Sequence, residues 1–313
     1  MKLFLGVDGG QSSTTALIGD ESGRVIGVGR AGPVNHVEGP EGPEKFLHAM
    51  EQCLYAAGEA GKHFASACFG FSGGPEDKET LTRNIVRSDI YRITHDAEIA
   101  LAGATAGKPG VVVIAGTGSM AFGKDPEGQT ARAGGWGYIF GDEGGAFDIV
   151  RQALRAVVRY EEGWGDPTAL REALLAATGA NSANDLLHKF YTKDWPRHRV
   201  AALAQTVEHA VTEGDETARQ ILGSAAHALA ILAQSVRRKL FPEHLPATIS
   251  YVGGVFRSRA ILERFRLLVE LEDGNHVAAP LYGPAAGALI EAYRAAGVEC
   301  TLKDVPEEKI ASE

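Results

Sequence analysis

Two loops rich in glycine and hydroxyl side chains each follow a short apolar run, and their composition suits the binding of phosphate groups. The first loop spans residues 8–13 and the second spans residues 116–119. Turns of this composition direct backbone N–H groups and hydroxyls into one concavity, where they can meet phosphate oxygens. A lone loop of this kind is more often a polar β-turn. Because the chain has two of them after similar apolar runs, we favour a phosphate-binding role for both.

The common nucleotide-binding motifs do not account for these glycines. A P-loop ends in Gly-Lys followed by Ser or Thr, but Gly107-Lys108 is followed by Pro109. The looser dinucleotide pattern occurs twice, from Gly27 and from Gly116. Neither match is followed by a predicted helix that would present its N-terminus to a pyrophosphate. Both matches are therefore set aside.

Asp96 is well placed for acid–base chemistry. It ends a predicted strand and precedes residues 97–101, the start of a predicted helix. A carboxylate in such a position can act as the general base that takes the proton from an attacking hydroxyl group. Asp is also a favoured N-cap residue, so Asp96 can equally begin the helix. The two roles are compatible, and we predict the catalytic one.

The composition excludes several classes of protein. The chain has 313 residues, 44% of them hydrophobic and 23% charged, which is typical of a globular protein of two domains. Its 31 basic and 40 acidic residues give a net charge of −9, which argues against a nucleic-acid surface. The three cysteines are widely spaced, which argues against a disulfide framework or a Cys-x-x-Cys metal site. No apolar run is long enough to cross a bilayer, so we expect a cytoplasmic protein without a membrane partner.

The elements that must position the first loop and Asp96 form a predicted sheet with helices. Runs typical of strands lie at 3–8, 16–18, 24–28, 65–71 and 91–94. The first three are joined by short turns, as in an antiparallel meander. Apolar residues at helical spacing predict an amphipathic helix over 44–60.

The second half repeats the opening order of strand, glycine/hydroxyl loop, strand and acidic turn. Its predicted strands are 111–114, 120–122 and 248–252, and its predicted helices lie within 143–240, over 258–268 and from 284 onward. The repetition indicates a duplicated domain, and the alternation of strands and helices indicates an α/β fold.

We place the domain boundary near 103–109, where glycine, alanine, lysine and proline gather without periodicity. Residues 1–106, completed by the helix 284–297, would form the first domain. Residues 107–283 would form the second, with a helical insertion. The polar tail after Cys300 is predicted to be loose.

Taken together, four elements in a fixed order resemble the superfamily of sugar kinases, actin and heat-shock-protein ATPases. They are the two loops, Asp96, and Gly253-Gly254 after the last main strand. The resemblance covers essentially the whole chain and implies two actin-like (ribonuclease H-like) domains around an interdomain cleft. It also implies ATP and Mg²⁺ as cofactors, with Asp8 holding the metal through water. The residues it assigns to ATP binding are Asp8, Gly9, Gly10, Ser12, Ser13, Thr117, Gly118, Ser119, Gly253 and Gly254.

The segment 134–146 carries the most specific resemblance. It is similar to the Gly-Gly-Trp-Gly…Gly-Asp-Glu-Gly segment of N-acetylglucosamine kinases and related members of the BadF/BadG/BcrA/BcrD ATPase family. The resemblance implies that Trp136 offers a flat face on which a sugar stacks and that Asp142 accepts sugar hydroxyls. Two structural alternatives stay open: Asp142 can cap a helix over 143–160, and Trp136 can anchor the core.

Two further positions match the same kinases. Asn35-His36 resembles the pair whose asparagine contacts the sugar, although residues 33–35 by themselves would be interpreted as a turn. Ser72-Gly73-Gly74 matches another loop of the cleft. The residues assigned to the substrate by resemblance are Asn35, Ser72, Asp96, Gly135, Trp136, Gly137 and Asp142.

The function implied is an ATP-dependent kinase that phosphorylates the primary hydroxyl of an amino sugar, first of all N-acetylglucosamine. Met120 stands where the animal enzymes carry asparagine, so glucosamine and N-acetylmuramic acid stay open as acceptors. An ATPase that activates a partner redox enzyme is a rival from another class. This chain lacks the cysteine segment with which such activators hold an iron–sulfur cluster, and that absence argues against the rival. A sugar sensor without activity is a second rival, against which the intact Asp8 and Asp96 weigh. The small-molecule sugar is the expected partner, and a homodimer is left open.

Overall fold

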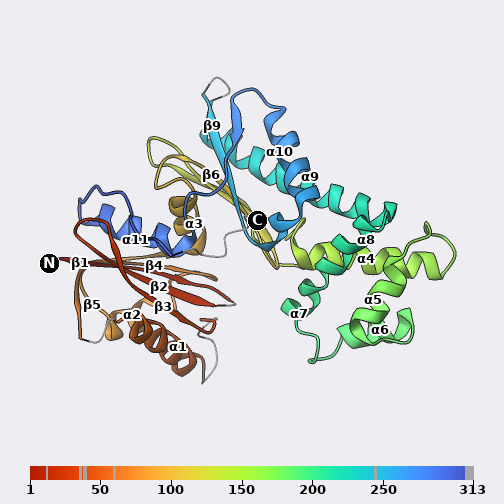
Figure 1. The fold of residues 1–313 in the computed structure, drawn as a ribbon, viewed down its shortest axis with the longest axis horizontal. Helices are drawn as coiled ribbons and strands as arrows, with labels where there is room; N and C mark the ends of the chain where they lie inside the picture. The colour runs from red at the N-terminus through yellow and green to blue at the C-terminus, as the bar shows by residue number, and fades with distance from the viewer. Residues whose placement is uncertain (12, 35–36, 38–40, 59–60, 243–244, 307–313) are drawn as a thin grey trace. The chain divides into compact units, whose positions relative to one another are not determined.

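The computed structural model describes residues 1–11, 13–34, 37, 41–58, 61–242 and 245–306, and it divides into two compact units. The first unit contains residues 1–112, 123–128 and 279–306, and the second contains 113–122 and 129–278. Each unit has a five-stranded sheet covered by helices (Figure 1). The predicted α/β class is therefore confirmed.

The first sheet has the strand order β3-β2-β1-β4-β5. The bounds are Leu3–Gly9 for β1, Thr14–Asp20 for β2, Val25–Ala31 for β3, His63–Phe71 for β4 and Arg87–His95 for β5. The strands β1, β2 and β3 form the predicted antiparallel meander, while β1, β4 and β5 run parallel. Gly9 pairs with Phe71, and Phe71 with His95, so the carboxyl ends of the three parallel strands meet at one edge of the sheet.

Helices cover both faces of this sheet and form two cores. On one face lie α1 (Gly42–Ala56) and α2 (Glu79–Ile85), and on the other lie α3 (Asp96–Ala104) and α11 (Pro284–Ala295) (Figure 1). A side chain at Gly6 of β1 would collide with the backbone of α11, for example at 2.8 Å from the carbonyl oxygen of Ala285. Glycine in β1 thus allows α11 to lie directly on the strand.

The described part of the C-terminal tail is not loose, and that prediction is wrong for residues 301–306. The backbone of Lys303 accepts a hydrogen bond from Val25 N at 3.0 Å and donates one to Gly23 O at 2.9 Å. Leu302 is buried in the core beside α11. Backbone pairing and one apolar anchor therefore bind this polar segment to the first unit. Residues 307–313 lie outside the described part of the chain.

The second sheet has the order β10-β9-β6-β7-β8. The bounds are Gly110–Ala115 for β6, Ser119–Lys124 for β7, Thr130–Gly134 for β8, Ala247–Val252 for β9 and Asn275–Val277 for β10. When β6 is matched to β1, this order is the same as that of the first sheet. The predicted duplication is therefore confirmed at the level of strand order, and the two glycine/hydroxyl loops occupy equivalent positions, β1–β2 and β6–β7.

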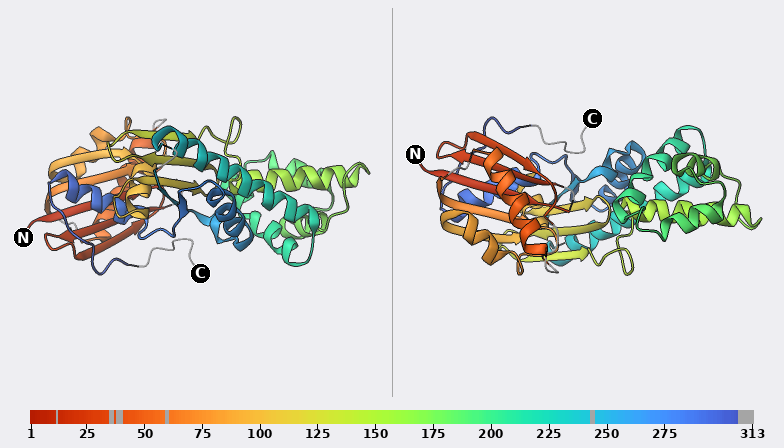
Figure 2. Two further views of the ribbon diagram at one scale, coloured as in Figure 1. Left: turned by 90° about the horizontal axis from the view of Figure 1, so that it is seen from above. Right: turned by 90° about the horizontal axis from the view of Figure 1, so that it is seen from below.

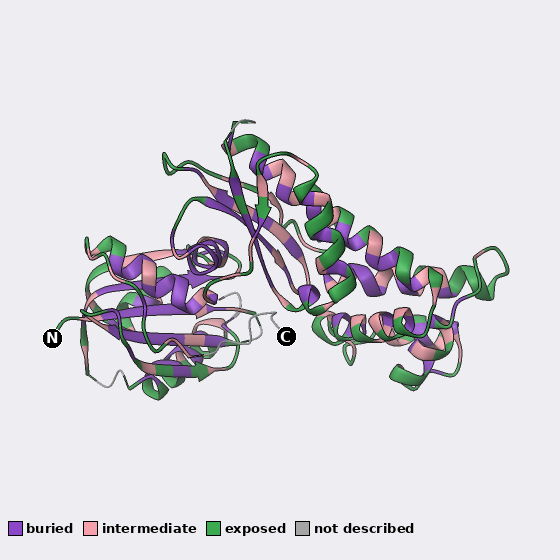
Figure 3. Cartoon of the chain, turned by 45° about the horizontal axis from the view of Figure 1, so that its top comes forward, coloured by how far each residue is buried: buried purple, intermediate pink, exposed green. Residues whose placement is uncertain are grey.

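The predicted helical region of the second half consists of six helices in the described residues. They are α4 (Ala146–Glu161), α5 (Leu170–Thr178), α6 (Ala183–Phe190), α7 (Arg197–Ala202), α8 (Ala204–Thr212) and α9 (Glu216–Leu240). In both views of Figure 2, α4 to α8 extend beyond the sheet of their own unit. Buried residues follow one side of α9, which packs against β8 and α10 (Arg259–Glu270) (Figure 3). No helix of the described residues is long and apolar enough to span a membrane.

Candidate active site

The first glycine/hydroxyl loop is a tight hairpin between β1 and β2. Gly10 N donates to Ser13 O at 3.0 Å, and Val34 N donates to Gly10 O at 3.1 Å. A side chain at Gly9 would come within 2.5 Å of the Phe71 ring, so the strand end requires glycine. Asp8, at the end of β1, is partly buried. Ser12 lies outside the described residues.

Asp96 and Ser72 lie together at the same edge of the first sheet. Ser72 follows β4, and its backbone N–H donates to Gly9 O at 3.0 Å. The Ser72 hydroxyl donates a hydrogen bond to the Asp96 carboxylate. Burial raises the pKa of Asp96 above its ordinary value, and the hydrogen bonds from Ser72 and from backbone amides only partly oppose this. A carboxyl group with a raised pKa is the better proton acceptor, as general-base catalysis requires.

The structure corrects the capping alternative for Asp96. The N-cap residue of α3 is His95, and Asp96 is the first residue of the helix. The Asp96 carboxylate is therefore in the first turn, where the helix dipole favours negative charge, and its hydroxyl partner comes from the loop after β4.

A buried lysine, which the sequence did not single out, supports the loop after β4. Lys78 is fully buried, and its Nζ donates to Gly74 O at 3.0 Å and to Asp77 Oδ1 at 2.7 Å. Asp77 Oδ2 accepts a hydrogen bond from Val37 N at 3.0 Å. Burial tends to raise the pKa of Asp77, but the hydrogen bonds from Lys78 and Val37 outweigh it and keep the pKa below its ordinary value. Asn35, which the sequence assigned to the sugar, lies outside the described residues.

The second glycine/hydroxyl loop is joined to the start of α4. Ala146 N donates to Gly116 O at 2.9 Å, and Phe147 N donates to Thr117 O at 3.1 Å. These are amides of the first helical turn, which have no partner within their own helix. The loop carbonyls satisfy them, so the positions of residues 116–118 are set by α4.

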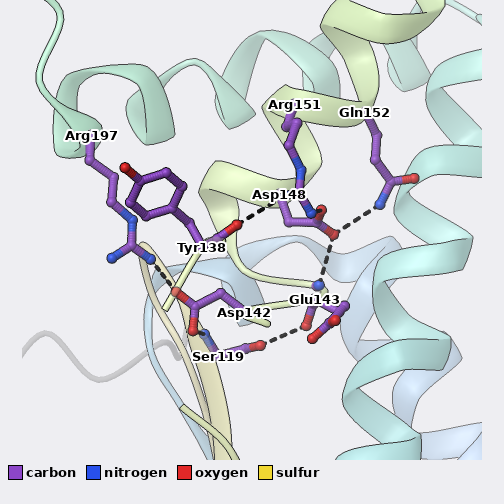
Figure 4. A network of polar contacts seen from close by, with 9 residues as sticks. Ser119, Tyr138, Asp142, Glu143, Asp148, Arg151, Gln152 and Arg197 are labelled. Atoms are coloured by element: carbon purple, nitrogen blue, oxygen red, sulfur yellow. Dashed lines mark hydrogen bonds and ion pairs between the residues drawn. The ribbon is translucent and has the colours of Figure 1, made fainter. Parts of the chain in front are cut away.

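Ser119 uses both of its donors inside this network. Its hydroxyl donates to Glu143 O at 2.6 Å, and its backbone N–H donates to Asp142 Oδ1 at 3.4 Å (Figure 4). The residue is 4% exposed. Thr117 and Gly118 are more exposed than Ser119. A phosphate group at this loop would therefore meet Thr117 and Gly118, while Ser119 holds the neighbouring segment.

The carboxylate of Asp142 lies against the second loop. Asp142 is 5% exposed and has a left-handed backbone, with φ of 65°. A side chain at Gly118 would overlap the Asp142 carboxylate, at 2.5 Å from its Cγ. Asp142 Oδ2 forms an ion pair with Arg197 of α7. The alternative that Asp142 caps a helix beginning at residue 143 is wrong, because α4 begins at Ala146 and its N-cap is Gly145.

Asp148 and Arg151 of α4 hold the segment that precedes the helix. Asp148 Oδ2 accepts hydrogen bonds from Gly144 N at 3.1 Å and from Gln152 Nε2 at 2.9 Å. Arg151 donates to Asp148 Oδ1 at 2.6 Å and to Tyr138 O at 3.0 Å (Figure 4). Sequence reasoning missed both residues, although their i,i+3 spacing on a predicted helix was a visible signal.

Trp136 is exposed, so the alternative that it anchors the core is wrong. Its exposed fraction is 66%, and the Arg132 guanidinium lies 4.7 Å from the ring centre. Gly135 and Gly137, on either side, have left-handed backbones, with φ of 73° and 78°. A side chain at Gly135 would meet Met120 at 3.4 Å. Met120 therefore lies against the backbone of the residue that precedes Trp136.

Gly253 and Gly254 follow β9 and lie beside the end of β6. Gly253 has φ of 110°, and a side chain there would overlap the carbonyl of Ala115. At Gly254 nothing lies within 4 Å of the position that a side chain would take. The backbone is thus closely packed at Gly253 and open at Gly254, where a flat ligand such as an adenine ring would have room.

The carboxylates present are compatible with Mg²⁺ bound together with a nucleotide. Among the described residues no three His, Cys, Asp or Glu side chains are grouped so that they could hold a metal by themselves. Mg²⁺ usually keeps several waters and takes one or two carboxylates plus substrate phosphates, so a protein cage is not needed. Asp8, the first residue of the first loop, would offer such an ion a hard oxygen ligand.

Two sheets of one strand order, each with a glycine/hydroxyl loop after its first strand, place the chain in the class of two-domain actin-like sugar-kinase folds. A crystal structure of a candidate N-acetylglucosamine kinase from Chromobacterium violaceum matches with a TM-score of 0.75 and 25% identity, over 93% of this chain and 98% of that one. The chain belongs to the BadF/BadG/BcrA/BcrD ATPase family, whose sequence model matches residues 5–292.

Two curated relatives are similar over most of their length. The N-acetylmuramic acid/N-acetylglucosamine kinase of Clostridium acetobutylicum is 30% identical over 280 residues, which cover 87% of this chain and 91% of the relative. The N-acetyl-D-glucosamine kinase of Dictyostelium discoideum is 30% identical over 281 residues, which cover 83% of this chain and 88% of the relative. The family resemblance inferred from segment 134–146 is therefore confirmed.

Proposed function

We propose that this protein is an ATP-dependent kinase that phosphorylates the primary hydroxyl of an amino sugar, with N-acetylglucosamine as the first candidate. The observation that carries the proposal is the contact of the Asp142 carboxylate with Gly118 of the second loop. Through this contact, the carboxylate that we assign to sugar hydroxyls lies directly beside the loop that we assign to phosphate oxygens. The named activities of the two curated relatives support an amino sugar as the acceptor.

On the nucleotide side, we assign phosphate contacts to the two hairpin loops. Thr117 and Gly118 would donate from the second loop and Ser13 from the first, where Gly9 and Gly10 would let the phosphates approach the backbone. Gly253 and Gly254 would border the adenine. Asp8 would hold Mg²⁺ through water, and the metal would neutralise charge on the phosphates. Positioning and charge neutralisation are the main contributions of a protein to phosphoryl transfer.

On the acceptor side, Asp96 is the proposed general base. The oxygen of the sugar hydroxyl forms a bond to the γ-phosphorus as the bond from that phosphorus to the bridging oxygen of ADP breaks, and the hydroxyl proton passes to the Asp96 carboxylate. The buried position of Asp96, which raises its pKa, favours this proton transfer. The hydrogen bond from Ser72 would orient the carboxylate.

For sugar recognition we assign Asp142 to hydroxyl groups and the Trp136 face to the apolar side of the ring. Gly135 and Gly137 would allow close approach of the backbone. Met120 packs under Gly135, and we assign it to the group that distinguishes one amino sugar from another. Asn35 stays our proposed partner for an N-acetyl group, because an amide side chain offers both a donor and an acceptor.

The rival function, activation of a partner redox enzyme, is not supported by the cysteines. Cys53 and Cys68 are both buried in cores of the first unit. Burial raises the pKa of Cys53 to about 12 and that of Cys68 above its ordinary value as well. Iron–sulfur clusters require thiolate ligands, and these side chains are unsuited to that role.

A coupled ADP-release assay tests the proposal. Purified protein, MgATP and a panel of N-acetylglucosamine, glucosamine, N-acetylmuramic acid and glucose should show turnover that depends on an amino sugar. The Asp96→Asn variant serves as the control for contaminating kinases, since it should remove the sugar-dependent part. Turnover that no hexosamine stimulates above the water background would contradict the proposed function.

A further inference from the structure

Arg197 joins helix α7 to the proposed site through Asp142. It is the first residue of α7 and lies 55 positions beyond Asp142 in the chain. Its Nη2 donates to Asp142 Oδ2, which the structure records as an ion pair. Its side chain is 31% exposed, whereas that of Asp142 is 7% exposed. The Arg197 side chain is therefore the more exposed member of the pair.

Two aromatic rings fix the Arg197 guanidinium. It lies 5.2 Å from the ring centre of Tyr138 and 5.7 Å from that of Phe147. The two rings also contact each other edge to face, with centroids 5.2 Å apart. The planar guanidinium therefore lies over an aromatic pair. One of its nitrogens pairs with the Asp142 carboxylate, and Tyr138 lies beside it (Figure 4).

The contacts with Ser119 and Arg197 fix the orientation of the Asp142 carboxylate. One oxygen accepts from Ser119 N and the other pairs with Arg197. A carboxylate has about four lone-pair sites, so acceptor capacity is left over for hydroxyl groups. Because both oxygens are held, the plane of the carboxylate is fixed. A fixed carboxylate can accept two adjacent hydroxyls in one defined geometry.

We infer that Arg197 is the positioning residue for Asp142 and that its charge sets which amino sugars the site prefers. The inference rests on the proposed function. Arg197 neutralises Asp142, so this carboxylate offers hydroxyl acceptors without adding a net negative charge to the site. A neutral N-acetylated sugar is then accepted, while a sugar with a protonated free amine gains little from Asp142 and meets a neighbouring cation.

The test compares Arg197→Gln, Arg197→Lys and wild type, with Arg199→Gln as the matched control. Arg199 lies on the same helix and also contacts an aromatic ring, Trp195 at 4.1 Å, but donates to Asp194 O instead of a site residue. Steady-state KM and kcat are measured for N-acetylglucosamine and for glucosamine at a pH where its amine is protonated. The KM for ATP is measured in parallel.

In Arg197→Gln we expect the KM for N-acetylglucosamine to rise about tenfold or more, with the KM for ATP within about twofold. The KM for glucosamine should rise less or fall, because the uncompensated Asp142 attracts its ammonium. Arg197→Lys should keep the wild-type preference between the two sugars but raise both KM values about threefold or more, since a point charge cannot stack and pair like a guanidinium. Arg199→Gln should match wild type.

The outcomes separate this inference from the proposed function. A wild-type protein without sugar-dependent ADP release would overturn both. An active wild type, together with an Arg197→Gln variant of unchanged sugar preference, would overturn the charge role alone. An Arg197→Lys variant with native KM values would overturn the positioning role. If Arg197→Gln fails to fold, Arg197→Lys tests the positioning role. The charge role is then tested with the double variant Asp142→Asn, Arg197→Gln, which removes both charges. A sugar preference shifted toward glucosamine in the double variant would contradict the charge role.

Discussion

The Ser72 hydroxyl donates a hydrogen bond to the Asp96 carboxylate, and the Ser72 backbone N–H binds the carbonyl of Gly9 at the end of β1. Ser72 thus links the proposed catalytic base to the end of β1, where the first glycine/hydroxyl loop begins. Both contacts depend on the parallel pairing of β1, β4 and β5, whose carboxyl ends meet at this edge.

Replacement of Asp96 by asparagine should separate activity from stability. We expect kcat to fall at least about a hundredfold, the lower range of general-base contributions, with sugar affinity within a few-fold. The pKa of Asp96 is raised in the folded protein, so its ionised form opposes folding at neutral pH and its protonated form does not. Asp96→Asn should therefore have a higher Tm than wild type at pH 7. The difference should shrink as the pH falls toward the ordinary carboxyl value of 3.8.

Thermal unfolding over a pH series, beside kcat from ADP release, measures both effects. A variant with nearly native kcat would show that Asp96 is only a residue of the first helical turn. A lower Tm at neutral pH would show that the carboxylate stabilises the fold.

Replacement of Ser72 by alanine should move the pH–rate profile. The Ser72 hydrogen bond favours the ionised form of Asp96, so its loss should raise the pKa of Asp96 further. The acid limb of kcat/KM should then shift to higher pH, with a smaller loss at the plateau than in Asp96→Asn. Ser88→Ala, whose hydroxyl donates to Ile90 O on the same unit, is a suitable control. An unshifted acid limb would mean that Ser72 does not act through Asp96.

Replacement of Gly118 by alanine should damage the sugar site through a steric effect. The new methyl group would overlap the Asp142 carboxylate, which is already held by Ser119 and Arg197. We expect a rise of about tenfold or more in the sugar KM, since a displacement of about 1 Å can cost a hundredfold in rate. Gly116→Ala is the control for the loop, because nothing lies within 4 Å of its added carbon. Equal sugar KM values in the two variants would contradict the contact.

The buried Lys78 and its exposed partner Asp77 should respond asymmetrically to substitution. Asp77→Asn leaves the fully buried Lys78 ammonium without its counter-charge, which costs up to about 3–5 kcal/mol when both partners are buried and less here, because solvent screens Asp77. Lys78→Met removes the buried charge and keeps the side-chain volume. It leaves the hydrogen-bond acceptors of Lys78 unpaired, which should lower the free energy of unfolding by about 1–3 kcal/mol. The free energy of unfolding in urea should therefore fall more for Asp77→Asn. The opposite order would show that Asp77, which is partly exposed, contributes little to the neutralisation of Lys78.

Much of the fold was predictable because its signals are local. The apolar run of β1 and the hydroxyl-rich turn after it lie within about ten residues of one another, and the repeat that begins at β6 is equally compact. Strand periodicity and turn composition act over such distances. The same holds for the start of α3 at Asp96 and of α11 at Pro284.

The types and order of the candidate site residues were thus determined by the sequence alone, through strand ends, glycine turns and the segment 134–146. Only the tertiary structure decided that Asp142 turns away from α4 toward Arg197, that Trp136 is exposed, and that Lys303 pairs beside Gly23. The members of each long-range pair are separated by tens or hundreds of residues. Their contact depends on how whole helices and strands pack, and no propensity of a short segment specifies that packing.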